Sequence, residues 1–242
     1  MQQEYFERYL LHIRELSIKS VENYTQALRK IDSVLQSYGF KEYGSIYDID
    51  SYAELRYIEQ MLKQDEEFCA LDSRGKQMYT AGLHNYMNFV EGKAFDRKSE
   101  PLALIDCPVA PSGKRTLVVR EEGNRDHIIV RQVLIAEHFQ CEYDSSHRTF
   151  TSAAYKMPYM EGHHLIPLKK QDHFEYSLDV YANIFSLCPI CHRLLHHGVQ
   201  SEKKPVWRKL FNERKERLEE SGIRLGAKEF LELITESENK RL

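Results

Sequence analysis

The sequence has no apolar run of the roughly 18 residues that a membrane-spanning helix needs, so we predict no membrane span. Its first residues, MQQEYFERYL, carry charges where a signal peptide has an apolar core. We therefore expect a cytoplasmic protein, in which thiols stay reduced. Internal repeats and low-complexity tracts are also missing.

Cysteine and net charge are both low. The 242 residues include five cysteines, an odd number, and Cys188 and Cys191 have C-x-x-C spacing. In a reducing compartment this spacing favours metal or redox chemistry over structural disulfides. The net charge of −3 means that any nucleic-acid site must be a local patch. The length is comfortable for two domains.

Residues 1–92 are predicted to form a bundle of about four helices. One helix has apolar residues at helical spacing and ends before Gly39: Val21, Tyr24, Leu28, Ile31, Leu35 and Tyr38. Ser51 and Glu54 form a capping-box pattern before a second apolar series: Leu55, Ile58 and Leu62. A further helix is expected over 73–91, ended by Gly92, with one apolar face: Tyr79, Leu83, Tyr86 and Val90.

The stretch YFERYLLHIRELSIKSVENYTQALRKIDSVL resembles the N-terminal helical, SAM-like domain of tyrosine recombinases. The resemblance covers at most the first 92 residues and implies DNA binding; oligomerisation or partner docking is the alternative. The region carries 15 acidic and 10 basic residues, so a DNA surface there must be local. We expect five basic side chains to gather at one end of the bundle: Arg74, Lys76, Lys93, Arg97 and Lys98.

Residues 93–124 contain Pro101, Pro108 and Pro111 and are predicted to be a linker, with one strand at 116–119 (TLVV). Residues 125–242 form the second predicted domain. It starts with a helix in RDHIIVRQVLIAEHF that leads to Cys141, and it ends with two helices between Glu202 and Glu236. Cys69 and Cys107 are expected to be buried thiols.

Histidine and cysteine crowd into one window of the second domain. Eight of the eleven histidines and three of the five cysteines fall between residues 138 and 197. His192 and His196 are four residues apart before Gly198, a helix stop, so on a helix they share one face and can chelate one ion. His163 and His164 are adjacent in a stretch with strand character, EGHHLIPL, where alternate side chains point to opposite faces. The alternative for His163 and His164 is a pair of buried histidines whose hydrogen bonds are satisfied within the core. The alternative for the C-x-x-C pair is redox chemistry.

The pattern resembles the HNH, or ββα-metal, nucleases. The residues that carry the resemblance are Glu161-Gly-His163-His164, Asn183, Cys188-Pro-Ile-Cys191-His192 and His196. Nine residues separate Asn183 from His192 and four separate His192 from His196, as in colicin-type DNases. The segment, about residues 141–198, is also similar to the zinc-organised HNH domains of modification-dependent restriction endonucleases.

This resemblance implies a role for each matching residue. His163, His192 and His196 match the ligands of the catalytic ion, although the family often has aspartate at the first position. His164 matches the general base that deprotonates the attacking water, and Asn183 matches the residue that fixes the loop and orients that base. An all-imidazole ligand set suits Zn, Ni, Co or Mn better than Mg.

A structural zinc ion is predicted beside this centre. Cys188 and Cys191 need two partners for tetrahedral coordination. The usual family partner is a second C-x-x-C upstream, which this sequence lacks, and Cys141 and His147 stand in its place. We therefore expect a Cys3His site. The remaining histidines of the region, at 127, 138, 173 and 197, are assigned no role.

The segment EKKPVWRKLFNERKERLEE has seven basic and five acidic residues. Five cationic side chains there and in the preceding helix are candidates for contacts with the DNA backbone: Arg193, Lys203, Lys204, Arg208 and Lys209. The alternative is a solvated helix face that packs through Trp207, Leu210 and Phe211, with Arg193 facing water.

The sequence as a whole predicts an α+β protein, with a helical N-terminal bundle followed by a zinc-braced ββα-metal nuclease domain and C-terminal helices. The resemblance implies a DNA endonuclease that leaves 5′-phosphate and 3′-hydroxyl ends, in a restriction or antiviral defence role. Double-strand cleavage by one active site calls for a homodimer or two events. A non-catalytic, zinc-organised DNA-binding protein and an RNA-cleaving toxin effector are the alternatives. No small-molecule cofactor is expected.

Overall fold

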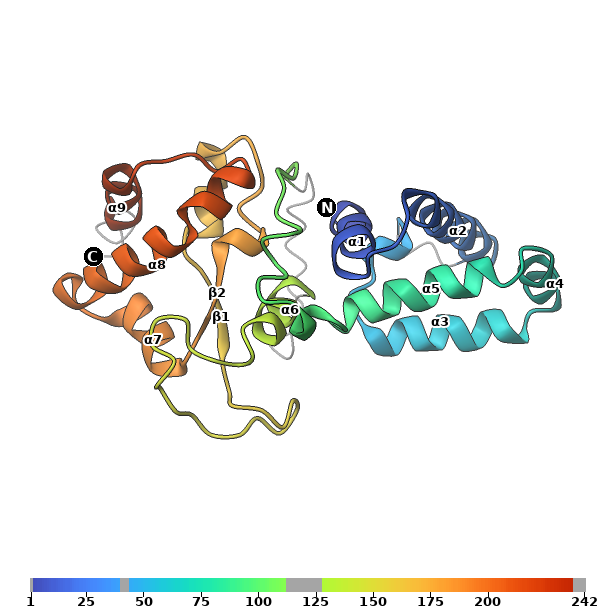
Figure 1. Cartoon of the computed structure of the whole chain (residues 1–242), viewed down its shortest axis with the longest axis horizontal. Coiled ribbons are helices and arrows are strands. Elements are labelled where there is room, and N and C mark those ends of the chain that lie inside the picture. The colour runs from blue at the N-terminus through green and yellow to red at the C-terminus, as the bar shows by residue number, and fades with distance from the viewer. Residues whose placement is uncertain (1, 40–43, 112–127, 237–242) are drawn as a thin grey trace. The chain divides into compact units, whose positions relative to one another are not determined.

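The computed structural model describes residues 2–39, 44–111 and 128–236. The predicted strand at 116–119 lies outside these residues. The described chain divides into two compact units, one that reaches Lys98 and includes Ile128, and one that begins at Ser99. Figure 1 labels the helices and strands of both. None of the described helices is long and apolar enough to cross a membrane.

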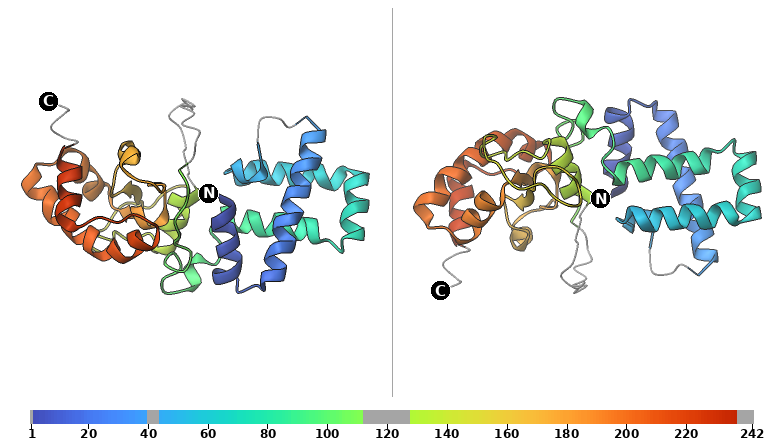
Figure 2. Two further views of the ribbon diagram at one scale, coloured as in Figure 1. Left: turned by 90° about the horizontal axis from the view of Figure 1, so that it is seen from above. Right: turned by 90° about the horizontal axis from the view of Figure 1, so that it is seen from below.

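The first unit is helical. Its elements are α1 (Gln2–Arg8) with a π-helical turn (Tyr9–Ile13), α2 (Ile18–Ser37), a 3₁₀ turn (Ile46–Asp48), α3 (Tyr52–Gln64), α4 (Glu66–Arg74), α5 (Met78–Val90) and a 3₁₀ turn (Phe95–Arg97). Figure 2 shows α2 running across α3 and α5. Six aromatic rings pack edge-on or stacked in the core of this unit: Phe6, Tyr9, Tyr47, Tyr86, Phe89 and Phe95.

The helix ends of this unit follow the predicted signals in two places. Helix α2 is followed by Gly39, which has a φ of 84° and donates its N–H to Gln36 O. Glycine adopts this left-handed backbone without a steric penalty. The Ser51 side chain accepts a hydrogen bond from Glu54 N and caps α3.

The helix predicted over 73–91 is interrupted, because α4 ends at Arg74 and α5 begins at Met78. Lys76 and Gln77 have positive φ angles of 54° and 62°. The Asp72 carboxylate stabilises the break by accepting hydrogen bonds from the N–H groups of Tyr79 and Thr80, the first turn of α5. Asp72, near the end of α4, thus caps the start of α5.

Two other expectations for this unit are wrong. Arg74 and Lys76 lie before α5, whereas Lys93, Arg97 and Lys98 follow its end, so a 13-residue helix of about 20 Å separates the basic residues expected to gather. Lys93 and Lys98 are also paired, with Glu91 and Glu15. Cys69 is exposed and not a buried thiol, and Cys107 of the second unit is only partly buried.

The second unit surrounds a two-stranded antiparallel sheet. Its elements are α6 (Ile128–Ala136), β1 (Glu161–His164), 3₁₀ turns at Leu168–His173 and Tyr181–Asn183, β2 (Ile184–Leu187), α7 (Pro189–His197), α8 (Gln200–Glu220) and α9 (Ala227–Glu236). His163 pairs with Phe185 and His164 with Ile184 across the sheet. The two helices expected between Glu202 and Glu236 correspond to α8 and α9, and α7 ends before Gly198 as predicted.

Close packing places β1 against α6. A Cβ atom on Gly162 would lie 2.5 Å from Val130 Cγ1, so only glycine allows this approach. All four residues of β2 are buried. The segment at 140–142 lies along β2, because Glu142 N donates to Ser186 O and Ser186 Oγ donates to Gln140 O. The strand that carries both histidines is therefore fixed by its neighbours.

Part of the predicted linker is packed into this unit. Leu102, Ile105 and Val109 are buried, and Ser177 N donates to Val109 O at 2.7 Å. The buried carboxylate of Asp106 pairs with Arg217 of α8. Burial raises the pKa of Asp106, and Arg217 opposes that rise.

Candidate metal centres

Three imidazoles converge between β1 and α7. Their ring centroids lie 5.1 Å apart for His163 and His192, 5.0 Å for His163 and His196, and 4.7 Å for His192 and His196. One nitrogen of each ring falls within 4.8 Å of the others. The spacing of four residues on α7 and the alternation of β1 produce this arrangement. The donor set is that of a transition-metal or zinc site with room for further ligands.

The surroundings keep these rings able to bind a cation. Burial lowers the pKa of His163 well below its ordinary value, and the neighbouring histidines His192 and His196 lower it further. Burial also lowers the pKa of His192, while the carboxylate of Glu161 opposes this shift. A neutral imidazole has the lone pair that a metal ion requires.

Glu161 lies beside His192, one of the three clustered imidazoles. Its Oε2 is 2.6 Å from His192 Nδ1, an ion-pair distance at which the angles are not those of a hydrogen bond. A carboxylate in this position orients a ligating imidazole and increases its basicity. Glu161 and His163 are two residues apart on β1 and therefore share a face. That spacing was the signal by which the sequence could have indicated a role for Glu161.

His164 has a carboxylate partner of its own. Its Nε2 lies 3.0 Å from Asp179 Oδ1, and both side chains are 22% exposed. A contact of this kind sets the tautomer, with the proton on Nε2 and the lone pair on Nδ1. Asp179 was not singled out from the sequence, because nothing in the 15 residues that separate it from His164 predicts that the loop returns to this point.

Asn183 contacts the loop and not the base. Its side chain accepts from Ile166 N and donates to Ile166 O and Leu178 O, all at 2.8 Å, and it is fully buried. Leu178 precedes Asp179, so the amide ties together the ends of the loop that brings Asp179 to His164. The Asn183 amide is thus connected to the imidazole of His164 only through the loop and Asp179.

Both adjacent histidines of β1 line one cavity of about 360 Å³, together with His192 and His196 of α7. Leu165, Leu195, Trp207 and Ile234 supply apolar walls, and Lys169 is a cationic side chain on the lining. The strand alternation sends His163 inward, at 8% exposure, and leaves His164 more accessible. The cavity therefore presents a cluster of three imidazoles that could hold a metal ion and a separate imidazole to the same space.

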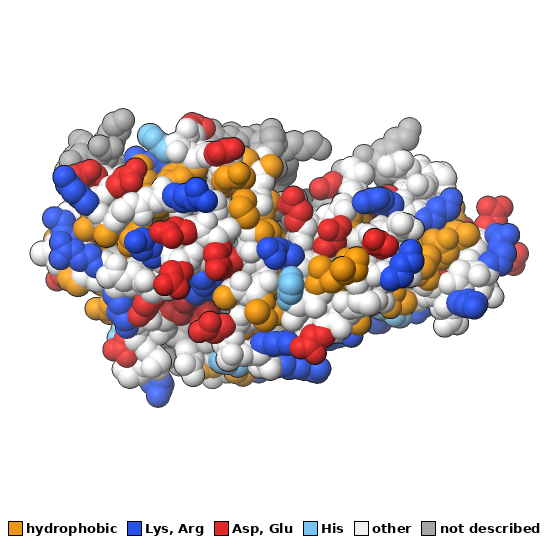
Figure 3. Space-filling view, turned by 45° about the horizontal axis from the view of Figure 1, so that its top comes forward, with side chains coloured by type: hydrophobic (Ala, Val, Ile, Leu, Met, Phe, Trp, Pro, Cys, Tyr) orange, Lys and Arg blue, Asp and Glu red, His pale blue; other side chains and the backbone are white. Residues whose placement is uncertain are grey.

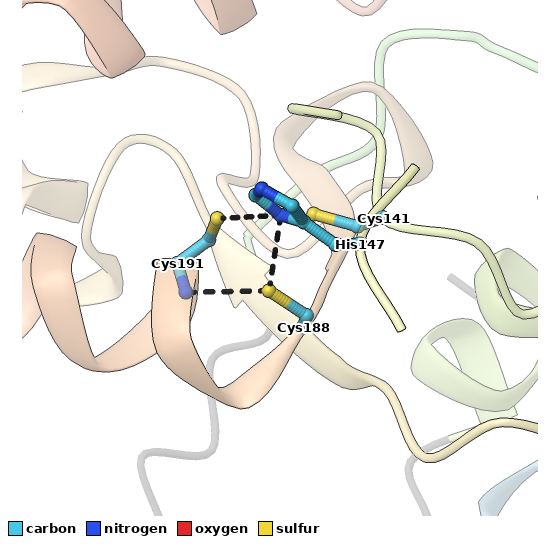
Figure 4. A group of neighbouring side chains, drawn as sticks. All are labelled: Cys141, His147, Cys188 and Cys191. Atoms are coloured by element: carbon cyan, nitrogen blue, oxygen red, sulfur yellow. Dashed lines mark hydrogen bonds between the residues drawn. The ribbon is translucent and has the colours of Figure 1, made fainter. Parts of the chain in front are cut away.

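The predicted Cys3His group also comes together. Ligand atoms of Cys141, His147, Cys188 and Cys191 all lie within 4.8 Å of one another, and Figure 4 shows the four side chains pointing to a common centre. His147 Nδ1 lies 3.4 Å from the sulfurs of both Cys188 and Cys191. On its other side, His147 Nε2 is 3.5 Å from Asp144 Oδ2, the carboxylate–histidine arrangement common behind metal ligands.

The chemistry of the Cys3His group fits zinc. All three cysteines are free thiols. A hydrogen bond from Cys191 lowers the pKa of Cys141 to about 4, and the same contact raises the pKa of Cys191. The lowered pKa of Cys141 favours its thiolate, and a thiolate is the form that binds zinc. Cys188 also caps α7, accepting from Cys191 N.

The candidate DNA contacts fall into two groups. Arg193, Lys204 and Arg208 are exposed. Lys203 is only 3% exposed, lies over the Trp207 ring and is 3.5 Å from His196 O, so its predicted DNA contact is not supported. It belongs to the buried face of α8, which also holds Val206 and Leu210.

Lys209 is only partly available, because it donates to Tyr143 O at 2.5 Å. On the face drawn in Figure 3, basic and acidic side chains are interspersed over the described surface. This agrees with the near-balanced net charge, and any interaction with phosphates has to be local.

The model of the family described as HNH endonuclease matches residues 141–198, the segment that holds both candidate metal-ligand clusters. Neither the curated proteins nor the solved structures give a significant match. The matched segment supports the HNH family and indicates a nuclease of the HNH endonuclease type with a nucleic-acid substrate.

Proposed function

We propose that this chain is a metal-dependent endonuclease that hydrolyses phosphodiester bonds of DNA and leaves 5′-phosphate and 3′-hydroxyl ends. One observation carries the proposal: three imidazoles converge within 4.8 Å in a cavity that also presents His164, inside the segment that matches the HNH endonuclease family. Within the proposal, β1, β2 and α7 are the ββα-metal unit.

His163, His192 and His196 are the residues that would hold the catalytic ion, with Glu161 orienting His192. When bound, a divalent cation supplies Lewis acidity toward the phosphate and the leaving oxygen. The imidazole ligands favour Zn, Ni, Co or Mn over Mg. No thiolate is in this cluster, so its preference differs from that of the Cys3His group.

His164 is the proposed general base. Its Nε2 faces Asp179, which leaves Nδ1 to take a proton from the attacking water. Asp179 stabilises the imidazolium that results, because it is a carboxylate at hydrogen-bond distance. Asn183 acts through the loop, holding the backbone on either side of Asp179. A purely structural zinc module would need none of these three side chains.

The Cys3His group is proposed to hold structural zinc, which would fix the segment before β1 to the start of α7. The N-terminal helical unit is proposed to supply DNA affinity or to form a homodimer, in line with its resemblance to the SAM-like domain. A role in restriction or antiviral defence is proposed from the similarity of the zinc-organised site to that of modification-dependent enzymes.

Incubation of the purified full chain with supercoiled plasmid, with and without Zn, Ni, Co, Mn or Mg, tests this function. Nicked and then linear DNA should form only with a divalent ion, and the ends should be substrates for ligase. Plasmids with and without base modification, and a structured RNA, are compared in parallel. DNA binding without cleavage would favour the non-catalytic alternative, and cleavage of RNA alone would favour the toxin effector.

A further inference from the structure

A short hairpin before β1 presents an aromatic ring to solvent. Thr151 and Pro158 form a β-bridge, and Tyr159 N donates to Phe150 O at 2.8 Å. The Phe150 side chain is 65% exposed. Its ring is stacked on that of Tyr159, with centroids 4.8 Å apart and an interplanar angle of 15°. One face of the Phe150 ring is therefore covered by an aromatic partner while the residue as a whole stays open.

The stack is joined to the histidine cluster by a single carboxylate. The Tyr159 hydroxyl donates to Glu161 Oε1 at 3.2 Å, and the other oxygen of Glu161 lies 2.6 Å from His192 Nδ1. Figure 1 shows the chain passing from this hairpin directly into β1. The exposed Phe150 ring is thus linked to the histidine cluster through two side chains, Tyr159 and Glu161.

The hairpin holds the ring in a fixed place. Ser152 N donates to Met157 O at 2.8 Å and Lys156 N donates to Ser152 O at 2.9 Å. The ring of Tyr155 packs against that of Phe139, with centroids 5.3 Å apart. A ring on such a support loses little conformational entropy when a flat ligand stacks on it.

Cationic side chains accompany the stack. Burial and the Glu161 carboxylate raise the pKa of Tyr159 and Arg193 lowers it, so the Arg193 guanidinium acts on this hydroxyl through space. Arg193 is exposed, as are Arg148 and Lys156 beside and on the hairpin. An aromatic platform with cationic neighbours is the arrangement on which nucleobases of unpaired strands stack.

We propose that Phe150, supported by Tyr159, stacks on a nucleobase that has left the helical stack of DNA beside the scissile phosphate. The proposal rests on the proposed DNA endonuclease function. It specifies the substrate class: DNA in which a nucleotide near the cut is unpaired, mismatched or easily unstacked is cleaved faster than a stable duplex. A flat aromatic ring stacks on every base, so the preference is for structure and not for sequence.

The test asks whether the effect of replacing Phe150 depends on the presence of one particular base. The cut is first mapped on an end-labelled duplex with the full-length protein, and the duplex is then made with a single abasic site at each position around the cut. Phe150→Ala should lower kcat/KM on the intact duplex by about tenfold, the scale of one lost stacking contact. At one position, the abasic duplex should show no further loss from Phe150→Ala, because the base is already gone.

Three further variants make the result specific. Phe150→Trp should keep wild-type kcat/KM, and Phe150→Leu should behave like Phe150→Ala, because only an aromatic ring stacks. Leu104→Ala removes another exposed apolar side chain of the same unit, 43% exposed, and should change nothing. Zinc content equal to that of the wild type confirms that each variant is folded.

The stacking proposal is wrong, with the endonuclease intact, if wild-type protein cuts DNA and Phe150→Ala cuts it equally well. It is also wrong if Phe150→Leu restores activity, or if the loss from Phe150→Ala is the same on every abasic duplex. Failure of the wild type to cut DNA with any divalent metal overturns the proposed function and this proposal together.

Discussion

Asp179 offers the sharpest prediction about how the base is prepared. Its carboxylate lies 3.0 Å from His164 Nε2, and both side chains are 22% exposed, so solvent screens the contact only in part. A hydrogen bond between a charged and a neutral group contributes about 1.5–3 kcal/mol. If this energy is expressed as the imidazole takes up the proton, Asp179→Ala should lower kcat by roughly 10- to 150-fold.

Asp179→Asn should fall between the wild type and Asp179→Ala. Its amide oxygen still accepts from Nε2–H and keeps the tautomer, but it lacks the negative charge that stabilises the imidazolium. KM for DNA and metal content should stay unchanged for both variants, because Asp179 is not one of the three clustered histidine ligands. Glu175→Gln, which alters an exposed carboxylate on the same loop, is the matched control.

The assay that decides the matter is a double-mutant cycle in nicking rate. His164→Ala should cost about a hundredfold or more, the scale of a general base, and Asp179→Ala should then cost nothing further in that background. Equal losses from Asp179→Ala with and without His164 would refute the reasoning, because Asp179 would then act independently of the base.

Three other predictions concern stability and the division of labour. Cys141→Ser should unfold the second unit and release zinc, because the binding energy of structural zinc is folding energy; elemental analysis checks this, and a stable, zinc-free, active protein would contradict the site. Burial raises the pKa of Asp106 in the folded protein, so the fold favours the neutral carboxyl group. The stability that this group contributes is fully present below the unfolded pKa of about 3.9 and is lost as pH rises through the folded pKa. In urea unfolding, the stability of Asp106→Asn relative to the wild type should accordingly increase as pH rises from about 4 to 7, and a decrease would show that the charged form is favoured in the fold. A protein that begins at Ser99 should keep metal-dependent nicking but lose DNA affinity or target preference; loss of linear product alone, with a smaller mass on a sizing column, would instead show that the N-terminal unit dimerises.

Local chemistry explains what could be predicted from the sequence. The spacing of His192 and His196 is a property of one helix, and the alternation at His163 is a property of one strand. The backbone N–H and C=O groups at helix ends require partners outside the helix, which is why Ser51 and Gly39 could be predicted as caps. These features depend on neighbours in the chain, and the structure agrees with each of them.

Features that depend on the path of the chain could not be predicted. Asp179 contacts His164 across a loop whose two ends both hydrogen-bond to Asn183. Asp72 breaks the helix expected over 73–91 by capping residues seven and eight positions further on. The prediction for Lys203 failed for a different reason. Lys203 lies three and seven residues before Val206 and Leu210, a helical spacing that places it on the buried face of α8. Its positive charge had led us to expect a contact with DNA instead.

In the proposed site, one imidazole is a base and three others hold a metal ion. Nicking of plasmid by His164→Ala, measured beside its metal content, tests this most directly. The account predicts at least about a hundredfold slower cleavage, with wild-type metal content and wild-type affinity for DNA, because His164 is not in the ligand cluster. Full cleavage activity in His164→Ala, or loss of the metal together with activity, would contradict it.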